Sequence, residues 1–321
     1  MSTNKRRYRI RNWGAYNRAL IERGSLTVWL DEEALTPWYA QRKTGRRGAS
    51  PTYSAVAIQT TLMIREVFQL PLRATQGLMH SLLRLLAVEL RVPNFSTLSR
   101  RGGTLTVAIG RRAAPDARDV VIDATGLKVY GEGEWQVRRH GAGKRRVWRK
   151  LHLAVDPTYQ QSIAARLTTQ HVGDNEVLPE LLEQLDPTPE CPEAPIGSVA
   201  GDGAFDTRDC HDAILTRGAR ALIPPRDGAV PWPPRPDGQP HPRTEIVEHC
   251  RRHGRPHWKR HSGYHRRSRA ETEMFRYKTL FSDRLKNRRF DTQVTEAYVR
   301  LAALNIMTGL GMPESYPVPA A

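Results

Sequence analysis

The sequence predicts a mixed α/β protein, with a mixed sheet flanked by helices and a helical region before it. Three observations support this class. Residues 54–90 and 291–311 have apolar residues at helical spacing. Between residues 119 and 223, short apolar runs rich in β-branched residues alternate with helical segments. Residues 224–243 are rich in proline and cannot extend a central strand, so we expect a surface insertion there.

The N-terminal region is expected to be helical. An amphipathic segment at residues 54–70 can begin with Ser54 as its N-cap. A second segment follows, with an expected break near Gly77, and then a basic segment at 92–101 with Ser96 as its expected N-cap. Two amphipathic helices followed by a basic one fit a helix-turn-helix module, and they fit a plain helical bundle equally well.

The central region is expected to contain strands interrupted by helices. The predicted strands are 119–131, 147–156, 161–170, a short strand ending at Asp202, and 219–225. The predicted helices are 175–185, which Asp174 could open, and 207–218. A basic helix at 264–282 and a closing helix from Asp291 come next, and the proline-containing last ten residues are expected to be a loose tail.

The charge of the chain points to a polyanionic partner. The 321 residues have a formal net charge of +17. Residues 251–300 contain fifteen Lys or Arg and five Asp or Glu. Such a surplus attracts phosphates and gains from counterion release, which favours a nucleic acid. No apolar run approaches the roughly 20 residues of a membrane span, and three cysteines fit a reducing cytoplasm better than a disulfide framework.

Three acidic residues lie at positions that suggest a functional role. Asp123 lies in an apolar strand, and Asp202 lies among small residues that would let an ion approach closely. Glu271 lies on the predicted basic helix. Oxygen ligands of this kind suit Mg²⁺ or Mn²⁺, and two such ions can assist an in-line phosphoryl transfer. Taken singly, Asp123 could instead cap a turn and Asp202 could begin an Asx-turn.

The basic helix carries a patterned face. Tyr264, Arg267, Glu271 and Lys278 follow the spacing Tyr-x2-Arg-x3-Glu-x6-Lys. On an α-helix these offsets fall within a wedge of roughly 60°. A carboxylate between two cations could hold a phosphate beside a metal ion. The alternative is a solvated face with one i,i+4 ion pair.

Together these segments resemble a known family, the DDE transposases of bacterial insertion sequences whose third acid lies in a Tyr-Arg-Glu-Lys signature. The matching segments are VVIDATGLKVYG, VAGDGAFDT, ALIPPR, GYHRRSRAETEMFRYK and the earlier NFSTLSRR. The resemblance implies a ribonuclease-H-like catalytic domain, with Asp123, Asp202 and Glu271 as the ligands of two Mg²⁺ ions. It also implies that Arg267 and Lys278 hold DNA phosphates, with Tyr264 beside them.

On this basis we expect two domains. Residues 1–105 would form an N-terminal helical DNA-binding or dimerisation region, and residues 106–321 a ribonuclease-H-like catalytic domain with an insertion at about 224–262, before the last catalytic acid. The expected function is metal-dependent cleavage at transposon ends and strand transfer, by a homodimer acting on DNA in the bacterial cytoplasm, in association with the nucleoid. A ribonuclease-H-like nuclease without strand transfer and a non-catalytic transposase-derived DNA-binding protein are the alternatives.

Further residues near the signature are candidate DNA contacts. Trp258 could stack on a base or anchor the insertion to the core, Lys150 could face phosphates or solvent, and Arg149 could follow the DNA backbone. A zinc site at Cys250, His253 and His257 is not predicted, because no fourth ligand and no Cys-x2-Cys pair lie nearby.

Overall fold

The computed structural model describes residues 7–41, 50–110, 112, 116–129, 147–186 and 195–318. The chain divides into two compact units, Met1–Val107 with Ala302–Ala321, and Ala108–Leu301. We had assigned the whole C-terminal segment to the catalytic domain, but its last twenty residues group with the N-terminal unit. The physical reason is a strand pairing between the two ends of the chain.

That pairing forms a two-stranded sheet in the first unit. Strand β1 (Arg7–Ile10) runs antiparallel to β8 (Ser315–Val318), with Tyr8 opposite Pro317. Proline is tolerated here because a two-stranded sheet consists of edge strands. The prediction of a loose tail is therefore wrong for residues 315–318.

The rest of the first unit is helical. Its helices are α1 (Trp13–Glu22), α2 (Leu26–Trp29), α3 (Glu32–Leu35), α4 (Ala55–Val67), α5 (Leu72–Leu85) and α6 (Phe95–Gly102). Helices α4, α5 and α6 pack against one another. Ser54 caps α4 as predicted, since its hydroxyl accepts a hydrogen bond from the backbone N–H of Ala57 at 3.0 Å.

Two details of these helices differ from the prediction. Helix α5 continues through Gly77, because the cost of a mid-helix glycine, about 1 kcal/mol, is smaller than the gain from packing the apolar face of the helix. Helix α6 is capped by Asn94 rather than Ser96. The Asn94 side chain accepts hydrogen bonds from the Thr97 N–H at 2.8 Å and from the Ser96 hydroxyl at 2.9 Å.

A mixed six-stranded sheet forms the centre of the second unit. Its strands are β2 (Arg118–Val129), β3 (Trp148–Asp156), β4 (Gln161–Thr169), β5 (Ile196–Ala200), β6 (Arg220–Leu222) and β7 (Arg284–Leu285). Their order is β4-β3-β2-β5-β6, and β7 pairs with the end of β2. The pairs β2–β3 and β3–β4 are antiparallel, whereas β2–β5 and β5–β6 are parallel. This arrangement confirms the predicted ribonuclease-H-like mixed sheet, whereas β7 was too short to be predicted.

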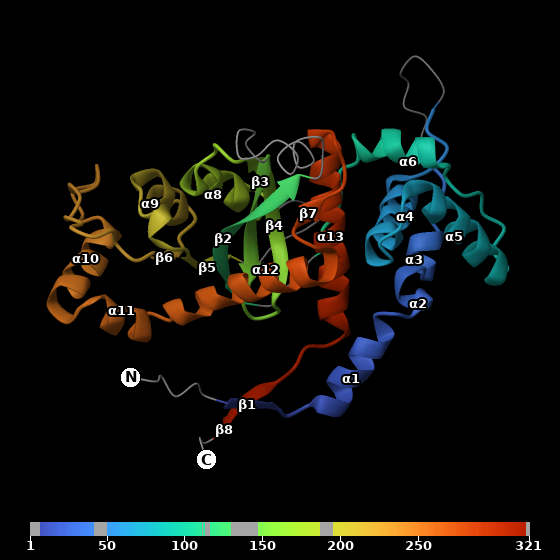
Figure 1. Ribbon diagram of the computed structural model, residues 1–321. Helices are drawn as coiled ribbons and strands as arrows, with labels where there is room; N and C mark the ends of the chain where they lie inside the picture. Colours follow the sequence, from blue (N-terminus) through green and yellow to red (C-terminus); the bar gives the residue numbers. More distant parts are fainter. Residues whose placement is uncertain are drawn as a thin grey trace, which may run out of the picture. The chain divides into compact units, whose positions relative to one another are not determined.

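Helices cover both faces of this sheet (Figure 1). On one face, α8 (Asp174–Glu183) and α9 (Arg208–Leu215) form an apolar core with Val120 and Ile122 of β2. Side chains alternate along a strand, so Asp123 points to the opposite face. Helix α12 (Ser268–Phe281) packs on β2 and β3 there.

The segment between β6 and α12 contains the predicted insertion. Its residues up to His241 form no helix or strand beyond β6, and helices α10 (Pro242–His253) and α11 (Arg255–His261) follow. Gly254 joins them with φ of 82°, a conformation that favours glycine, so the chain turns sharply and α10 and α11 contact each other. The closing helix α13 spans Phe290–Leu310, one residue longer at its start than predicted.

Close packing explains the glycine that precedes Asp202. A Cβ atom at Gly201 would lie 2.8 Å from Cδ2 of Phe205, which is buried. We expect Gly201→Ala to lower the free energy of unfolding by about 1–3 kcal/mol, the usual cost of overpacking. The matched control is Gly203→Ala, whose Cβ would meet only the Pro224 carbonyl oxygen at 3.6 Å. Urea unfolding measures both, and equal midpoints for the two variants would contradict the packing argument.

Candidate active site

Strand register brings Asp123 and Asp202 to the same end of one strand pair. The last paired residues of parallel strands β2 and β5 are Val121 and Ala200. Asp123 and Asp202 each follow two residues later, so the period of two places both on the same face, where the pairing ends. Burial raises the pKa of Asp123 above its ordinary value, and the charges of Asp202 and Glu271 add to this effect.

Arg267 connects the third acid to this pair. Its Nη1 donates to Oδ2 of Asp123 at 2.8 Å, and its Nη2 donates to Oε1 of Glu271. Glu271 lies in the first turn of α12, four residues after Arg267, and its side chain is 56% exposed. Burial opposes the charged form of Arg267, but the acids and Tyr264 outweigh it and raise its pKa. One guanidinium therefore bridges acids that are 148 positions apart in the sequence, Asp123 and Glu271.

Tyr264 borders the acids from the insertion side. Tyr264 and Arg267 belong to a 3₁₀ turn, η2 (Tyr264–Arg267), that precedes α12. The prediction of one α-helix from 264 onward is therefore wrong at its first turn. Burial raises the pKa of Tyr264, and the neighbouring carboxylates Asp202, Asp123 and Glu271 raise it further. The ring of Tyr264 also lies beside that of Trp258, which belongs to the predicted insertion.

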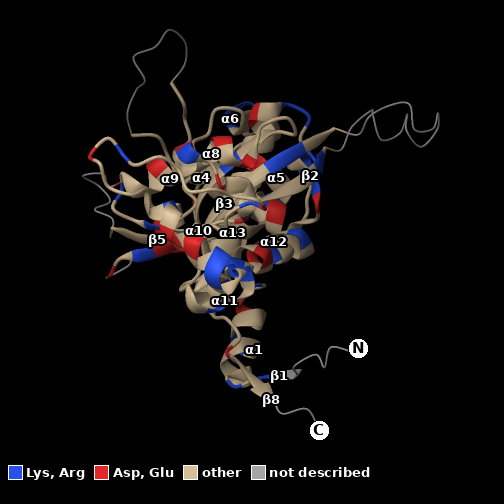
Figure 2. Ribbon diagram, turned by 90° about the vertical axis from the view of Figure 1, so that its left-hand side faces the viewer, with Lys and Arg blue, Asp and Glu red and all other residues tan. Residues whose placement is uncertain are grey.

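Lys278 lies in the last turn of α12, seven residues after Glu271. At 1.5 Å per residue this separates the two by about 10 Å along the helix axis. Lys and Arg residues also lie on α11, which precedes this helix, where the ribbon is blue in Figure 2. Basic residues therefore lie on both sides of Glu271 along the chain.

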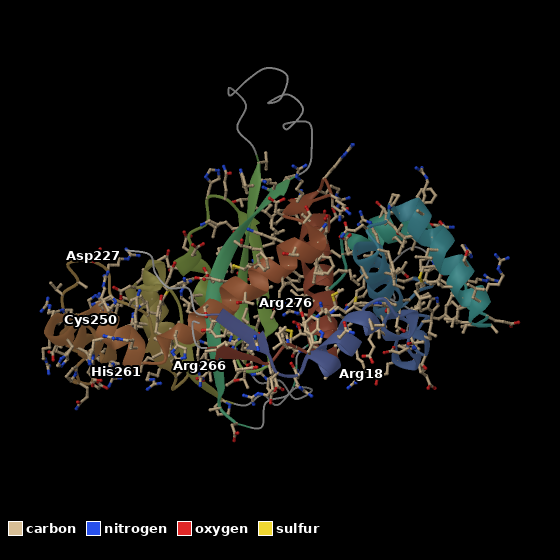
Figure 3. The ribbon with its side chains drawn as sticks, turned by 60° about the horizontal axis from the view of Figure 1, so that its bottom comes forward. Arg18, Asp227, Cys250, His261, Arg266 and Arg276 are labelled. Atoms are coloured by element: carbon tan, nitrogen blue, oxygen red, sulfur yellow. The ribbon has the colours of Figure 1, made fainter. Side chains whose placement is uncertain are left out.

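A second Arg–Asp pair fixes the 3₁₀ turn to the sheet. Arg266, labelled in Figure 3, donates from Nη1 to Oδ2 of Asp119. The other oxygen of Asp119 accepts a hydrogen bond from the Ser198 hydroxyl at 2.5 Å. Asp119 and Asp123 are four residues apart and share a face of β2. Adjacent arginines of η2 therefore hold two acids of one strand.

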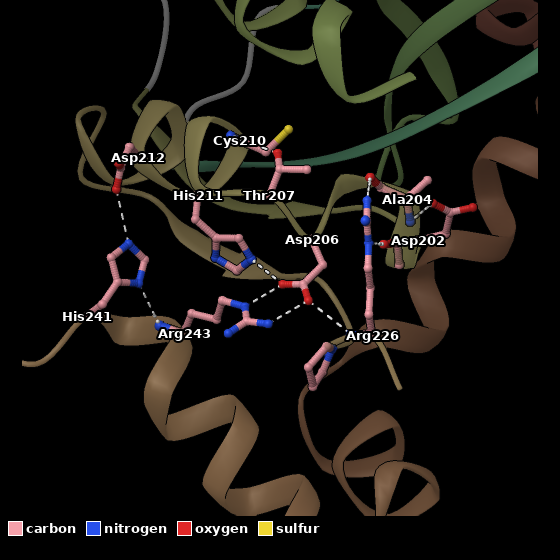
Figure 4. Close-up of polar contacts among 12 residues, drawn as sticks. Asp202, Ala204, Asp206, Thr207, Cys210, His211, Asp212, Arg226, His241 and Arg243 are labelled. Atoms are coloured by element: carbon pink, nitrogen blue, oxygen red, sulfur yellow. Dashed lines mark hydrogen bonds and ion pairs between the residues drawn. The ribbon is translucent and has the colours of Figure 1, made fainter. Parts of the chain in front are cut away.

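Asp202 is positioned by its own turn and by Arg226. Its Oδ1 accepts a hydrogen bond from the Ala204 N–H at 2.8 Å and caps η1 (Gly203–Phe205). Arg226 donates to the carbonyl oxygens of Gly203 at 3.1 Å and Ala204 at 3.0 Å (Figure 4). The strand that we predicted to end at Asp202 ends at Ala200 because this capped turn begins there.

Sequence reasoning missed the buried network that follows this turn. Asp206 accepts two hydrogen bonds from Arg243, at 2.5 and 2.7 Å, and one from the Arg226 backbone N–H at 2.9 Å. His211 Nε2 lies 3.2 Å from Oδ1 of Asp206, and the Arg243 guanidinium lies 4.1 Å from the centre of the Trp232 ring. Arg243 belongs to α10, so the network ties the insertion to the core (Figure 4).

The remaining candidate DNA contacts make intramolecular contacts. Arg149 donates to Gln293 at 2.9 Å, and Lys150 donates to the Val172 carbonyl oxygen and to Asp174 at 2.9 and 3.0 Å. Trp258 is 6% exposed, and its ring centre lies 5.6 Å from that of Tyr264. Its position fits the anchoring role better than base stacking.

His152, two residues after Lys150 on β3, is buried, and its Nε2 lies 2.9 Å from the hydroxyl oxygen of Thr168. Burial lowers its pKa to about 4, so it is neutral and does not face phosphates.

The acids match the donor chemistry of a hard divalent cation. All three supply carboxylate oxygens, the ligands that suit Mg²⁺ or Mn²⁺. Within the described ranges, no three His, Cys, Asp or Glu side chains already converge to hold a metal ion. At this site the guanidinium of Arg267 lies between Asp123 and Glu271, where it shows that the carboxylates accommodate a cation.

No helix in the described parts of the chain is long and apolar enough to cross a bilayer.

Two family models match the chain, and both are described as a transposase DDE domain. They cover residues 21–132 and 114–306, and the second alone exceeds half of the chain. A similar solved structure is the piggyBac transposase in a synaptic complex with hairpin DNA. It is 11% identical to this chain, with a TM-score of 0.37. The match covers 91% of this chain and 74% of the piggyBac chain. Because the family models span both the helical unit and the sheet with its acids, the chain belongs to the DDE transposases.

Proposed function

We propose that this DNA transposase cuts the phosphodiester bond at the ends of its element and joins the freed 3′-OH to target DNA, with two Mg²⁺ ions held by Asp123, Asp202 and Glu271. The register of β2 and β5 is the observation that carries the assignment. It gives the first two acids a common face and strand end, and Arg267 links Asp123 to Glu271. Mn²⁺ has the same ligand preference and would substitute.

The side chains around the acids have separate roles. Bound divalent ions would supply Lewis acidity and a water of lowered pKa. Arg267 would exchange its carboxylate partners for phosphate oxygens, since its fork suits both. Lys278 would add a point charge further along the strand of DNA, and Tyr264 would border the cleaved bond. This set corresponds to the Tyr-Arg-Glu-Lys branch of the family.

The strand chemistry requires no covalent protein–DNA link. Water would attack the phosphodiester at the element end, and the resulting 3′-OH would attack target DNA in the same site. The carboxylates stay fixed through both steps because each is held by the fold, Asp123 in a strand, Asp202 in a capped turn and Glu271 in a helix. Fixed charges of this kind stabilise a transition state without reorganisation.

The wider surface would bind the DNA arms. We assign DNA binding or dimerisation to the helical unit, where α6 carries Arg100 and Arg101 in its last turn. A homodimer would bring two element ends together. Arg149 and Lys150 remain candidate DNA contacts that would have to exchange their present partners, whereas Trp258 would anchor the insertion. Such an enzyme would act in the bacterial cytoplasm, in association with the nucleoid.

The test uses a labelled duplex carrying one end of the element, with purified full-length protein and a target plasmid. We expect Mg²⁺-dependent nicking of the duplex at the element end. We also expect a strand-transfer product in which the labelled strand is joined to the plasmid. Nicking without joining would identify a nuclease. Salt-sensitive DNA binding with neither product would identify a non-catalytic DNA-binding protein, and chelation of the metal is the control.

A further inference from the structure

Five histidines recur at every fourth position from the end of α10 to the start of the signature. They are His249, His253, His257, His261 and His265. Spacing of four places successive residues on one face of a helix. The first two belong to α10 and the next two to α11, and Gly254 turns the chain between them. Because α10 and α11 contact each other, the His-x3-His pair of α10 lies next to the pair of α11.

Three of the imidazole rings lie close to one another. The ring centres of His249, His253 and His257 are 5.0, 5.2 and 5.2 Å apart in the three pairs. Nε2 of His249 lies 3.1 Å from Nδ1 of His257. Two nitrogens that each lie about 2.0–2.1 Å from a tetrahedral zinc are separated by roughly this distance. One pair therefore already has ligand spacing, across the two helices.

We propose that this histidine cluster binds a late first-row divalent cation such as Zn²⁺, through His249 and His257 with His253 as the third ligand. Imidazole suits such ions, whereas Mg²⁺ prefers oxygen. As noted above, the described side chains do not yet present three donors to one point, so the ring of His253 must turn. His253 is exposed, which leaves it room to do so. His261, whose ring stacks 4.0 Å from that of His257, supports the cluster from α11.

The surrounding charges permit this site. The nearby arginines are directed to other partners. Arg252 pairs with Glu248 and Arg255 with Asp227, and Arg251 and Arg260 donate to the carbonyl oxygens of Ala229 and Pro256. The cluster is open to solvent, so an ion can enter. Bound metal would link α10 to α11, just before the turn that carries Tyr264 and Arg267.

The experiment is a Zn²⁺ titration of the metal-free full-length chain, from which any polyhistidine tag has been removed. Calorimetry should give one site per chain, and Co²⁺ should give the visible absorption of a low-symmetry nitrogen site. Binding should weaken at least about tenfold in His253→Ala and in His257→Ala, since even the outer partners of metal ligands are worth that much. His265 lies outside the cluster, so His265→Ala is the matched control and should bind Zn²⁺ with the affinity of the parent chain.

Two further arms separate this site from the acids and from DNA. Zn²⁺ binding should persist in Asp123→Asn/Glu271→Gln, because none of the three histidines belongs to the acidic site. Absence of saturable binding, or unchanged affinity in the double variant His253→Ala/His257→Ala, overturns the proposal. Loss of salt-sensitive DNA binding in that variant, without metal binding in the parent chain, would instead identify a phosphate contact.

Discussion

Asp123→Asn should abolish end cleavage while DNA binding stays within a few-fold of the parent chain, and Asp202→Asn and Glu271→Gln should do the same. An amide keeps the shape of the side chain but loses the charge that holds a divalent cation. We expect losses of at least about a thousandfold, the scale on which members of one catalytic unit act. A labelled end duplex measures cleavage, and a gel-shift titration measures binding.

Asp186→Asn is the matched control for these variants. Asp186 lies on the same unit, is half exposed and pairs with Arg217 at the surface, so its loss should leave cleavage unchanged. Because the three acids act together, combining two substitutions should add little to the loss from one. Mg²⁺-dependent nicking at the parental rate in each single variant would remove the acids from the mechanism.

The features that the sequence predicts around these acids have local determinants. Asp123 and Asp202 each end or interrupt an apolar run, and the alternation of a strand fixes the face of each side chain. The spacing of Arg267 and Glu271 likewise predicts their contact, since residues four apart are neighbours on a helix.

Contacts between distant segments were not predictable in this way. Strands β1 and β8 pair across almost the whole chain, and neither has a pattern that names its partner. Asp206 and Arg243 are separated by 37 positions, and the proline-rich segment between them has no periodicity. Such pairs depend on which surfaces the fold brings together, and local propensity carries no information about that.

Local competition explains the smaller errors. Asn94 and Ser96 are both good N-caps, and only the geometry of the chain entering α6 selects the first. The turn at Tyr264 tightens to 3₁₀ form because Arg266 and Arg267 must both reach acids on β2. A helical repeat of 3.6 residues cannot reveal a constraint imposed by another strand.

The second large effect is on stability. Asp206→Asn should lower the free energy of unfolding by about 3–5 kcal/mol, because removing one partner of a buried ion pair leaves the other charge uncompensated. Both side chains of the pair are at most 5% exposed. Urea unfolding measures the loss. The matched control is Arg252→Met, which breaks an exposed pair with Glu248 on the same helix and should cost at most about 1 kcal/mol.

A double-mutant cycle and a pH series identify the cause of that loss. Removing both charges in Asp206→Asn/Arg243→Met should cost less than the sum of the two single losses, since neither charge is then left buried alone. Burial by itself would raise the pKa of Asp206, but the bonds from Arg243, His211 and the Arg226 backbone hold it well below its ordinary value.

A depressed pKa in the folded state fixes the sign of the pH effect. Ionised Asp206 contributes its full stability above the ordinary pKa of about 3.9, and the contribution is lost as the pH falls below that value. The difference in stability between the parent chain and Asp206→Asn should therefore be largest near neutral pH and shrink in acid. A difference that stays constant from about pH 7 to pH 3 would show that packing, and not charge, makes this aspartate necessary for joining the insertion to the sheet.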